Sequence, residues 1–92
     1  MSYKIAFLPH AREDFEQWKK TDAKTVNKIK EILKDIAAHP YSGIGKPEPL
    51  KHGLSGKWSR RINKTDRIIY SVDGEKIIVY VFSMKGHYQN AH

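Results

Sequence analysis

The spacing of the apolar residues changes once along this chain, and that change limits the fold more than any other feature. Before residue 40 the apolar residues recur every three or four positions, as in Val26, Ile29, Leu33 and Ile36. Such a stripe is typical of one face of a helix. After residue 57 the segments are short and rich in β-branched and aromatic residues, as strands are. The order predicts helices packed on a sheet, which is an α+β domain.

The first forty residues predict one strand and two helices. Residues 4–8 form the strand, and a helix begins at Pro9 with Ala11, Phe15 and Trp18 on one face. Asp22 is the predicted N-cap of the second helix, with Thr21 as the alternative, and the helix stops at residue 40, a proline. Two helices joined by so few residues must form an antiparallel hairpin.

Residues 40–57 predict a long loop, because they hold four of the six glycines and three of the four prolines. A short turn or strand is expected around Leu50. Loops of this length in small domains are usually functional. Strands are predicted at 57–63, 67–72 and 76–82, with a hairpin turn at Asp73-Gly74 and the last strand in the centre of the sheet.

The strand at 57–63 alternates two sets of side chains, and the set that contains Trp58 is expected to face the helices. We therefore predict a single domain over residues 1–92, in which a helical hairpin packs on an antiparallel sheet. The two sets, in chain order, are Trp58, Arg60 and Ile62 on one side and Ser59, Arg61 and Asn63 on the other.

Composition removes several classes of protein. The chain has no cysteine, so it cannot be a disulfide scaffold, a thiol enzyme or a cysteine-ligated zinc finger. It has no apolar run near the roughly 20 residues of a membrane span, and no secretory signal is expected at its start. These features predict a cytoplasmic protein.

The net charge of +7 predicts an anionic partner. Residues 41–72 hold seven Lys or Arg against two Asp or Glu, which gives +5. A polyphosphate backbone is the partner that fits such a field best. The alternative is a solvated basic face without a specific partner.

No metal or cofactor site is predicted. None of the five histidines has a second ligand at helical spacing, and H-E-x-x-H is absent. The glycines at 43 and 45 are followed by prolines where a phosphate-binding loop would need a helix to start. Nucleotide hydrolysis is therefore not expected.

Glu48 is the candidate general base for phosphodiester cleavage. This reaction needs a base for the 2′-hydroxyl, cations for the phosphate oxygens and an acid for the leaving oxygen. Glu48 is the only carboxylate between residues 35 and 66, and a proline lies on each side of it. The alternative is an ion pair with Lys46 or Lys51.

The cations and the acid come from later segments. Arg61 and Arg67 lie on neighbouring predicted strands, so both guanidinium groups could bind one phosphate; the alternatives are a surface charge or a pair with Asp66. His87 is the candidate acid, and a loose C-terminal tail is the alternative. Tyr88 next to it offers a ring for stacking on a base.

Lys51 and His52 lie in the basic loop. We expect these two side chains to contact phosphate rather than to take part in the chemistry.

Three segments resemble one protein family. KPEPLKHGLSGKWSRRI at 46–62, RIIY at 67–70 and GHY at 86–88 closely resemble the signature of the Txe/YoeB toxins of the RelE superfamily, and the helical part is similar too. The resemblance covers nearly the whole chain. It implies an α+β fold like that of microbial ribonucleases. It also implies ribosome-dependent cleavage of mRNA in the A site, without a metal and through a 2′,3′-cyclic phosphate, which inhibits translation.

The resemblance also implies roles for individual residues. Glu48 matches the general base, His87 the general acid and Arg67 the arginine that stabilises the phosphate. Tyr88 matches a tyrosine that places the substrate. The remaining matches are basic positions near the site, namely Lys51, His52 and Arg61. Residues 89–92 depart from the family pattern, because members often end at or near the His-Tyr pair.

Finally, the resemblance implies partners. A cognate acidic antitoxin would hold the toxin inactive, and operator DNA would be bound only through that complex. The 70S ribosome and its mRNA would be the target, and a homodimer is a further arrangement seen in the family. Two alternatives to a ribosome-dependent enzyme are a basic module that blocks the A site without cutting and a ribonuclease that needs no ribosome.

Overall fold

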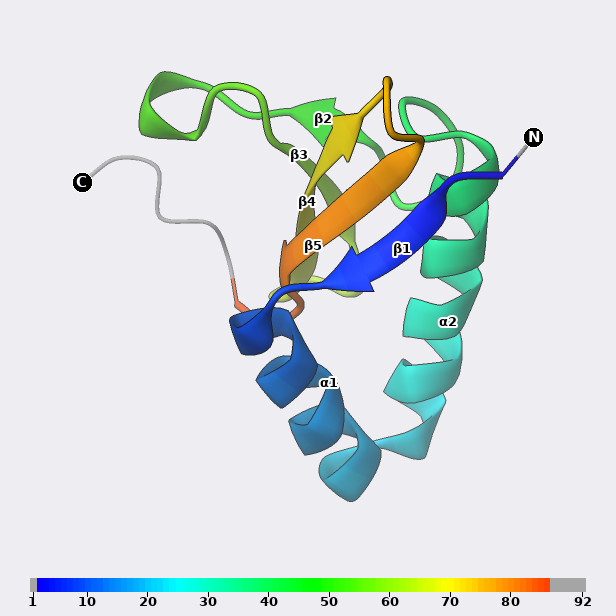
Figure 1. Ribbon diagram of the computed structural model, residues 1–92. Coiled ribbons are helices and arrows are strands. Elements are labelled where there is room, and N and C mark those ends of the chain that lie inside the picture. The colour runs from blue at the N-terminus through cyan, green and yellow to red at the C-terminus, as the bar shows by residue number, and fades with distance from the viewer. Residues whose placement is uncertain (1, 87–92) are drawn as a thin grey trace.

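In the part of the chain that the structure describes, the first and last strands lie side by side in one sheet, with two helices on one of its faces (Figure 1). The computed structural model describes residues 2–86. Over these residues the sheet has five strands, in the order β1-β5-β4-β3-β2. Its elements are β1 (Lys4–Phe7), α1 (Pro9–Thr21), α2 (Ala23–Ala38), β2 (Glu48–Pro49), a 3₁₀ turn (His52–Leu54), β3 (Trp58–Arg61), β4 (Arg67–Asp73) and β5 (Ile78–Ser83).

The helical hairpin is confirmed, and α1 and α2 form the two arms of a V below the sheet in Figure 1. Asp22, the residue between them, has an extended backbone and accepts hydrogen bonds from the amide and the hydroxyl of Thr25. These bonds lower the pKa of Asp22, the hydroxyl bond most. Asp22 rather than Thr21 is therefore the N-cap of α2.

The α+β class is confirmed, but the expectation of an antiparallel sheet is wrong for β1. This strand runs parallel to β5, with Lys4 opposite Ile78 and Phe7 opposite Val81. The other neighbouring strands are antiparallel. No hairpin turn joins β1 to β5, so nothing local in the sequence fixes their relative direction.

The hairpin predicted at Asp73-Gly74 forms, but β5 begins at Ile78 and not at Lys76. The carboxylate of Asp73 accepts hydrogen bonds from the amides of Glu75 and Lys76, which extends the turn to four residues. The predicted strand near Leu50 is present as β2, one residue earlier, and β3 is shorter than expected.

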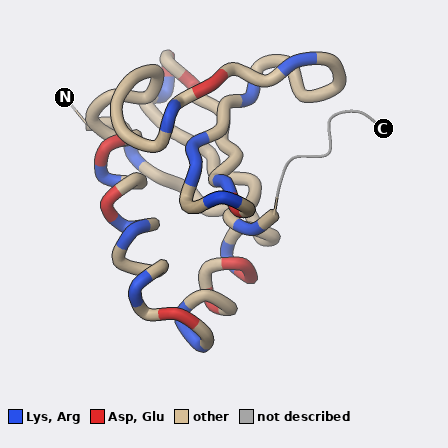
Figure 2. The backbone as a smooth tube through the Cα atoms, turned by 180° about the vertical axis from the view of Figure 1, so that it is seen from behind, with Lys and Arg blue, Asp and Glu red and all other residues tan. Residues whose placement is uncertain are grey.

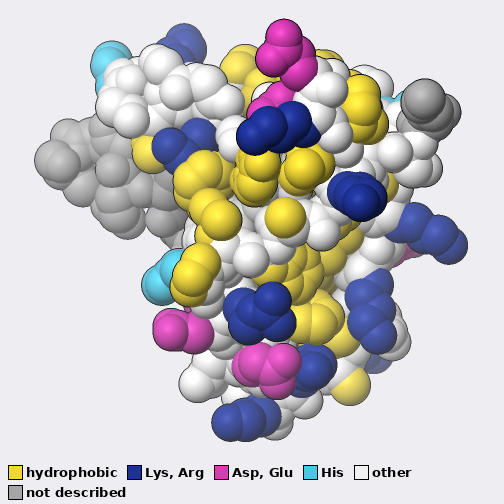
Figure 3. Space-filling view, viewed as in Figure 1, with side chains coloured by type: hydrophobic (Ala, Val, Ile, Leu, Met, Phe, Trp, Pro, Cys, Tyr) yellow, Lys and Arg dark blue, Asp and Glu magenta, His cyan; other side chains and the backbone are white. Residues whose placement is uncertain are grey.

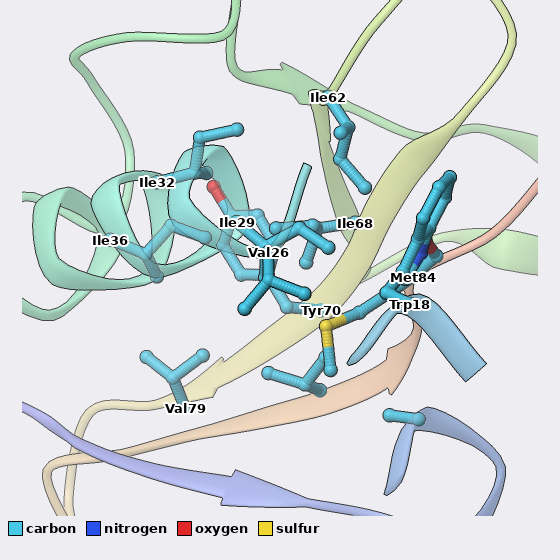
Figure 4. Close-up of a cluster of buried hydrophobic side chains, with 12 residues drawn as sticks. Trp18, Val26, Ile29, Ile32, Ile36, Ile62, Ile68, Tyr70, Val79 and Met84 are labelled. Carbon is cyan, nitrogen blue, oxygen red and sulfur yellow. The ribbon is translucent and has the colours of Figure 1, made fainter. Parts of the chain in front are cut away.

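The core lies between the helices and one face of the sheet (Figure 4). From α2 it receives Val26, Ile29, Ile32 and Ile36, and from the sheet Ile68, Tyr70, Val79 and Val81. Helix α1 adds a polar contact: the Trp18 indole donates to the Met84 carbonyl at 2.8 Å, and the Asp14 carboxylate accepts from the Met84 amide at 2.8 Å. The chain after β5 is therefore held from the helical side.

Candidate active site

The sheet face opposite the helices gathers the charged candidates. Trp58 packs against the core, so the alternation of β3 directs Ser59 and Arg61 to the other side. In the register, Glu48 lies opposite Ser59, Ser59 opposite Ile69, and Arg61 opposite Arg67. Residues opposite one another share a face. We call the surface formed by these five residues the open face.

Strand geometry places the three charged candidates within reach of one ligand. Glu48 and Arg61 are diagonal neighbours across β2 and β3, so their Cα atoms lie about 7–8 Å apart. Arg67 lies one strand further, with its Cα roughly 12 Å from that of Glu48 when strands are about 4.8 Å apart. From these positions, extended glutamate and arginine side chains are long enough to reach one phosphate and its neighbouring 2′-hydroxyl.

Glu48 is exposed at the start of β2. Within residues 2–86 it forms no ion pair, so the predicted alternative of a pair with Lys46 or Lys51 does not occur there. Among the strands of residues 2–86, β2 pairs with β3 alone, and residue 49, the other residue of β2, is a proline without an amide hydrogen. Glu48 is thus held at a sheet edge with its carboxylate directed to solvent.

Arg67 is half-buried, and its guanidinium lacks partners. In the described part of the chain, its Nε and Nη1 atoms are buried without a hydrogen bond. The predicted alternative, a pair with Asp66, is not found among residues 2–86. Buried guanidinium donors are normally satisfied, so these two atoms mark a place for acceptor oxygens.

Asp66 holds the end of the described chain instead. Its carboxylate accepts from the Gly86 amide at 2.7 Å, while the Arg67 amide donates to the Gly86 carbonyl at 3.1 Å. Burial acts to raise the pKa of Asp66, but the hydrogen bonds from Gly86, Asn63 and Thr65 outweigh it, and the pKa is lowered. The predicted His87 and Tyr88 lie outside the described residues, and the chain leaves the described part beside Arg67.

Lys51 and His52 lie apart from the two arginines. They follow β2 on the side of Glu48 away from Arg61, and both are exposed at the 3₁₀ turn. Lys57, which was not among the predicted site residues, lies nearer to the sheet, with its Nζ 4.6 Å from the centroid of the Phe82 ring. The structure therefore joins Glu48, Arg61 and Arg67 on one face and leaves the two loop residues at its edge.

Arg60 is not on the surface, although it was one of the seven cations of residues 41–72 that were expected to face an anionic partner. Its side chain is fully buried and donates to the Asp35 carboxylate at 2.6 Å and to the Tyr70 hydroxyl at 3.1 Å. It also donates to the carbonyls of His39, Ser42 and Ile44. Six of the seven cations predicted for residues 41–72 therefore remain available to a partner.

This arginine fixes the loop that leads to Glu48. The Asp35 carboxylate also accepts from the Ile44 amide, and its bond with Arg60 is the main reason why the pKa of Asp35 is lowered. Gly43 passes so close that a β-carbon there would lie 1.9 Å from an Asp35 oxygen. The glycine at 43 thus serves backbone packing and not phosphate binding.

A concave surface lies between β1 and the two helices, apart from the open face. It has a volume of about 480 Å³ and is lined by Ile5, Phe7, Arg12, Lys30, Leu33, Lys34 and Ala37. In Figure 3, apolar side chains cross the middle of the molecule with Lys and Arg around them. We call the surface lined by the seven residues from Ile5 to Ala37 named above the basic groove. Elsewhere, both helices carry acidic as well as basic residues (Figure 2).

The described residues contain no group of three or more His, Cys, Asp or Glu side chains arranged to hold a metal ion. Neither α1 nor α2, the helices of residues 2–86, combines the length and the apolarity that crossing a membrane requires.

Comparison with known proteins identifies the family. Residues 7–88 match the model of the YoeB-like toxins of bacterial type II toxin–antitoxin systems. The chain belongs to this family. A Streptomyces coelicolor relative described as Toxin YoeB is 42% identical over 76 residues, which cover 83% of this chain and 90% of the relative.

Two solved structures from Staphylococcus aureus extend the comparison. A YoeB dimer matches with a TM-score of 0.85 and 43% identity, covering 96% of this chain and 100% of the other. The toxin in a heterotetrameric YoeB–YefM toxin–antitoxin complex matches with a TM-score of 0.83 and 43% identity, over the same shares. The resemblance seen in the sequence and the RelE-type fold are therefore both confirmed, and this chain is a type II toxin.

Proposed function

We propose that this YoeB-family toxin is an endoribonuclease that cleaves mRNA in the ribosomal A site and thereby inhibits translation. The observation that carries the proposal is the meeting of a carboxylate and two arginines on the open face, where Glu48 forms no ion pair within residues 2–86. Within the described residues, Arg67 adds two buried donors without partners. A phosphodiester supplies the acceptor oxygens that such donors require.

The proposed reaction is an internal transfer followed by release of two RNA ends. Glu48 takes the proton of the 2′-hydroxyl, whose oxygen attacks the adjacent phosphorus. Arg67, with Arg61 beside it, stabilises the negative charge that grows on the non-bridging oxygens. His87 donates a proton to the departing 5′-oxygen, and the products are a 2′,3′-cyclic phosphate and a 5′-hydroxyl. These side chains supply base, cations and acid without a metal or another cofactor.

The ribosome has a specific part in this proposal. The open face provides groups for a phosphate, but none of its five residues is aromatic, so it offers no ring that could stack on a base. Tyr88, Lys51 and His52 would contact the substrate from the edge of the face. The 70S ribosome would hold the mRNA in the reactive conformation, which converts a loose encounter into an oriented one. The site of action is then the cytoplasm.

Primer extension on a defined mRNA bound to 70S ribosomes tests the proposal. We expect a discrete A-site cut by the wild type, and its loss by about a hundredfold or more in Glu48→Ala and in His87→Ala. Glu75→Ala is the matched control, because Glu75 is an exposed glutamate in the turn before β5. It should cleave like the wild type.

The other outcomes separate the alternatives. A ribosome stall without new 5′ ends, equal in all proteins, would mean that the toxin only blocks the A site. Equally efficient cutting of the same RNA without ribosomes would mean a free ribonuclease. Cleavage that survives in Glu48→Ala would remove this residue from the role of base.

The basic groove supports a protein partner. Its apolar floor with Arg12, Lys30 and Lys34 at the rim suits an acidic, amphipathic segment, and we infer that the cognate antitoxin occupies it. Operator DNA would be reached through the antitoxin, and a homodimer would be a separate state. Lys30→Glu with Lys34→Glu should weaken antitoxin binding in calorimetry, and unchanged affinity would contradict the inference.

A further inference from the structure

Ser59 places a buried hydroxyl in the middle of the open face. The residue is fully buried in β3, and within residues 2–86 its Oγ makes no hydrogen bond. Its neighbours in the register are Glu48 on one side and Ile69 on the other. A buried hydroxyl that lacks a partner destabilises the fold, so its presence calls for an explanation.

The position of Ser59 relates it to both arginines. Arg61 lies two residues along the same strand and points to the same face, and Arg67 is its diagonal neighbour across β3 and β4. In the described part of the chain, three buried side-chain atoms lack a hydrogen bond, namely Ser59 Oγ and the Nε and Nη1 of Arg67. All three can donate, and all three belong to the open face.

We propose that Ser59 is a third donor to the scissile phosphate, beside Arg61 and Arg67. This inference rests on the proposed ribonuclease function. The Ser59 hydroxyl would donate to a non-bridging oxygen and keep its proton throughout, so it forms no covalent bond. Its contribution grows as negative charge builds on that oxygen during attack by the 2′-oxygen, which is how preorganised donors accelerate a reaction.

Access to Ser59 depends on the side chains around it. Glu48 and Arg61 flank it, and both are long and exposed. Exposed side chains of this kind change rotamer within nanoseconds. A phosphate that enters between them would meet the hydroxyl and the two free donors of Arg67 together.

Ser59→Ala tests the proposal, because it removes the hydroxyl and little volume. We expect the single-turnover rate of A-site cleavage to fall about tenfold to a hundredfold, somewhat less than the loss of a main oxyanion donor, since two arginines remain. Ribosome affinity should stay the same. The denaturant midpoint should stay the same or rise, because the variant no longer buries an unmatched hydroxyl.

Two further variants sharpen the test. Ser71→Ala makes the same change on the same face of β4, opposite Tyr80 and four residues along the strand from Arg67, and should leave the cleavage rate unchanged. Ser59→Cys, studied under reducing conditions, keeps a weak donor of similar size. Its rate should lie between those of the wild type and Ser59→Ala.

Each remaining outcome is decisive. If Ser59→Ala cleaves like the wild type while Glu48→Ala does not, this inference is wrong and the proposed function stands. If Ser59→Ala loses stability and activity together, the hydroxyl is structural and the inference is also wrong. If the wild type itself does not cleave, the proposed function fails first, and that result is seen without any Ser59 variant.

Discussion

Arg60 and Arg67 lie on neighbouring strands and differ mainly in the face of the sheet to which they point. Arg60 points to the helices and is satisfied by Asp35, Tyr70 and three carbonyl groups. Arg67 points away from them, and its buried Nε and Nη1 have no partner among the described residues. One arginine completes the fold, whereas the other keeps donors available for a ligand.

The difference shows how one residue type serves stability and function in adjacent strands. A guanidinium with all its donors used cannot bind a phosphate, and one with donors left over lowers stability until a ligand arrives. The two roles can be separated by experiment, because stability and cleavage can be measured on the same variants.

Arg60→Met should have the largest effect, and the effect should be on stability. Removing the guanidinium leaves Asp35 and three loop carbonyls without their donor, which costs about 3–5 kcal/mol when a buried pair is broken. This is a large part of the total, since a domain of this size is stable by about 5–14 kcal/mol. Urea unfolding measures the change.

Replacing Asp35 as well tests whether Arg60→Met is unstable because this carboxylate has lost its partner. Adding Asp35→Asn to Arg60→Met removes the uncompensated charge and should recover part of the lost stability. If Arg60→Met unfolds at the wild-type midpoint, the buried network contributes nothing, and the contrast between the two arginines is lost.

Arg67→Met should show the opposite pattern. Methionine keeps much of the apolar stem but has no donors, so cleavage on the ribosome should fall by about a hundredfold to a thousandfold, as when an oxyanion donor is lost. The free energy of unfolding should stay the same or rise, because the variant no longer buries two unmatched donors. The same two measurements apply, and a variant that loses stability but retains cleavage would reverse the roles assigned to the two arginines.

The smallest expected effect is on the acid side of the stability curve. The pKa values of Asp35 and Asp66 are lowered in the folded protein, so their stabilisation is present above the unfolded value near 3.8 and is lost as the pH falls through the folded values. The free energy of unfolding should therefore drop below about pH 4. Asp35→Asn should flatten this drop.

Glu75→Gln is the control for this loss of stability at low pH, because it removes an exposed carboxylate that has no ion pair within residues 2–86. Its curve should keep the wild-type slope. An unchanged slope in Asp35→Asn would show that the Arg60 pair is not linked to protonation in this range.

Only those features of the candidate site that depend on nearby residues could be predicted from the sequence. Glu48 stood out because it is an isolated carboxylate between prolines, and the alternation of β3 correctly separated Arg61 from Arg60. That Arg60 would be buried was not predicted, since its acceptors come from α2, the following loop and β4. The assignments of His87 and Tyr88 remain predictions that rest on family resemblance.

Local sequence patterns predict the helical stripe, the cap at Asp22, the β4–β5 hairpin and the two faces of β3, because each depends on residues close together in the chain. The tertiary structure decided the parallel pairing of β1 with β5, the neutralisation of Arg60 by Asp35 and the anchoring of Gly86 by Asp66. These join residues 20 or more positions apart. Side-chain and backbone partners at such separations are selected by packing and hydrogen bonding in the folded chain, which no local pattern encodes.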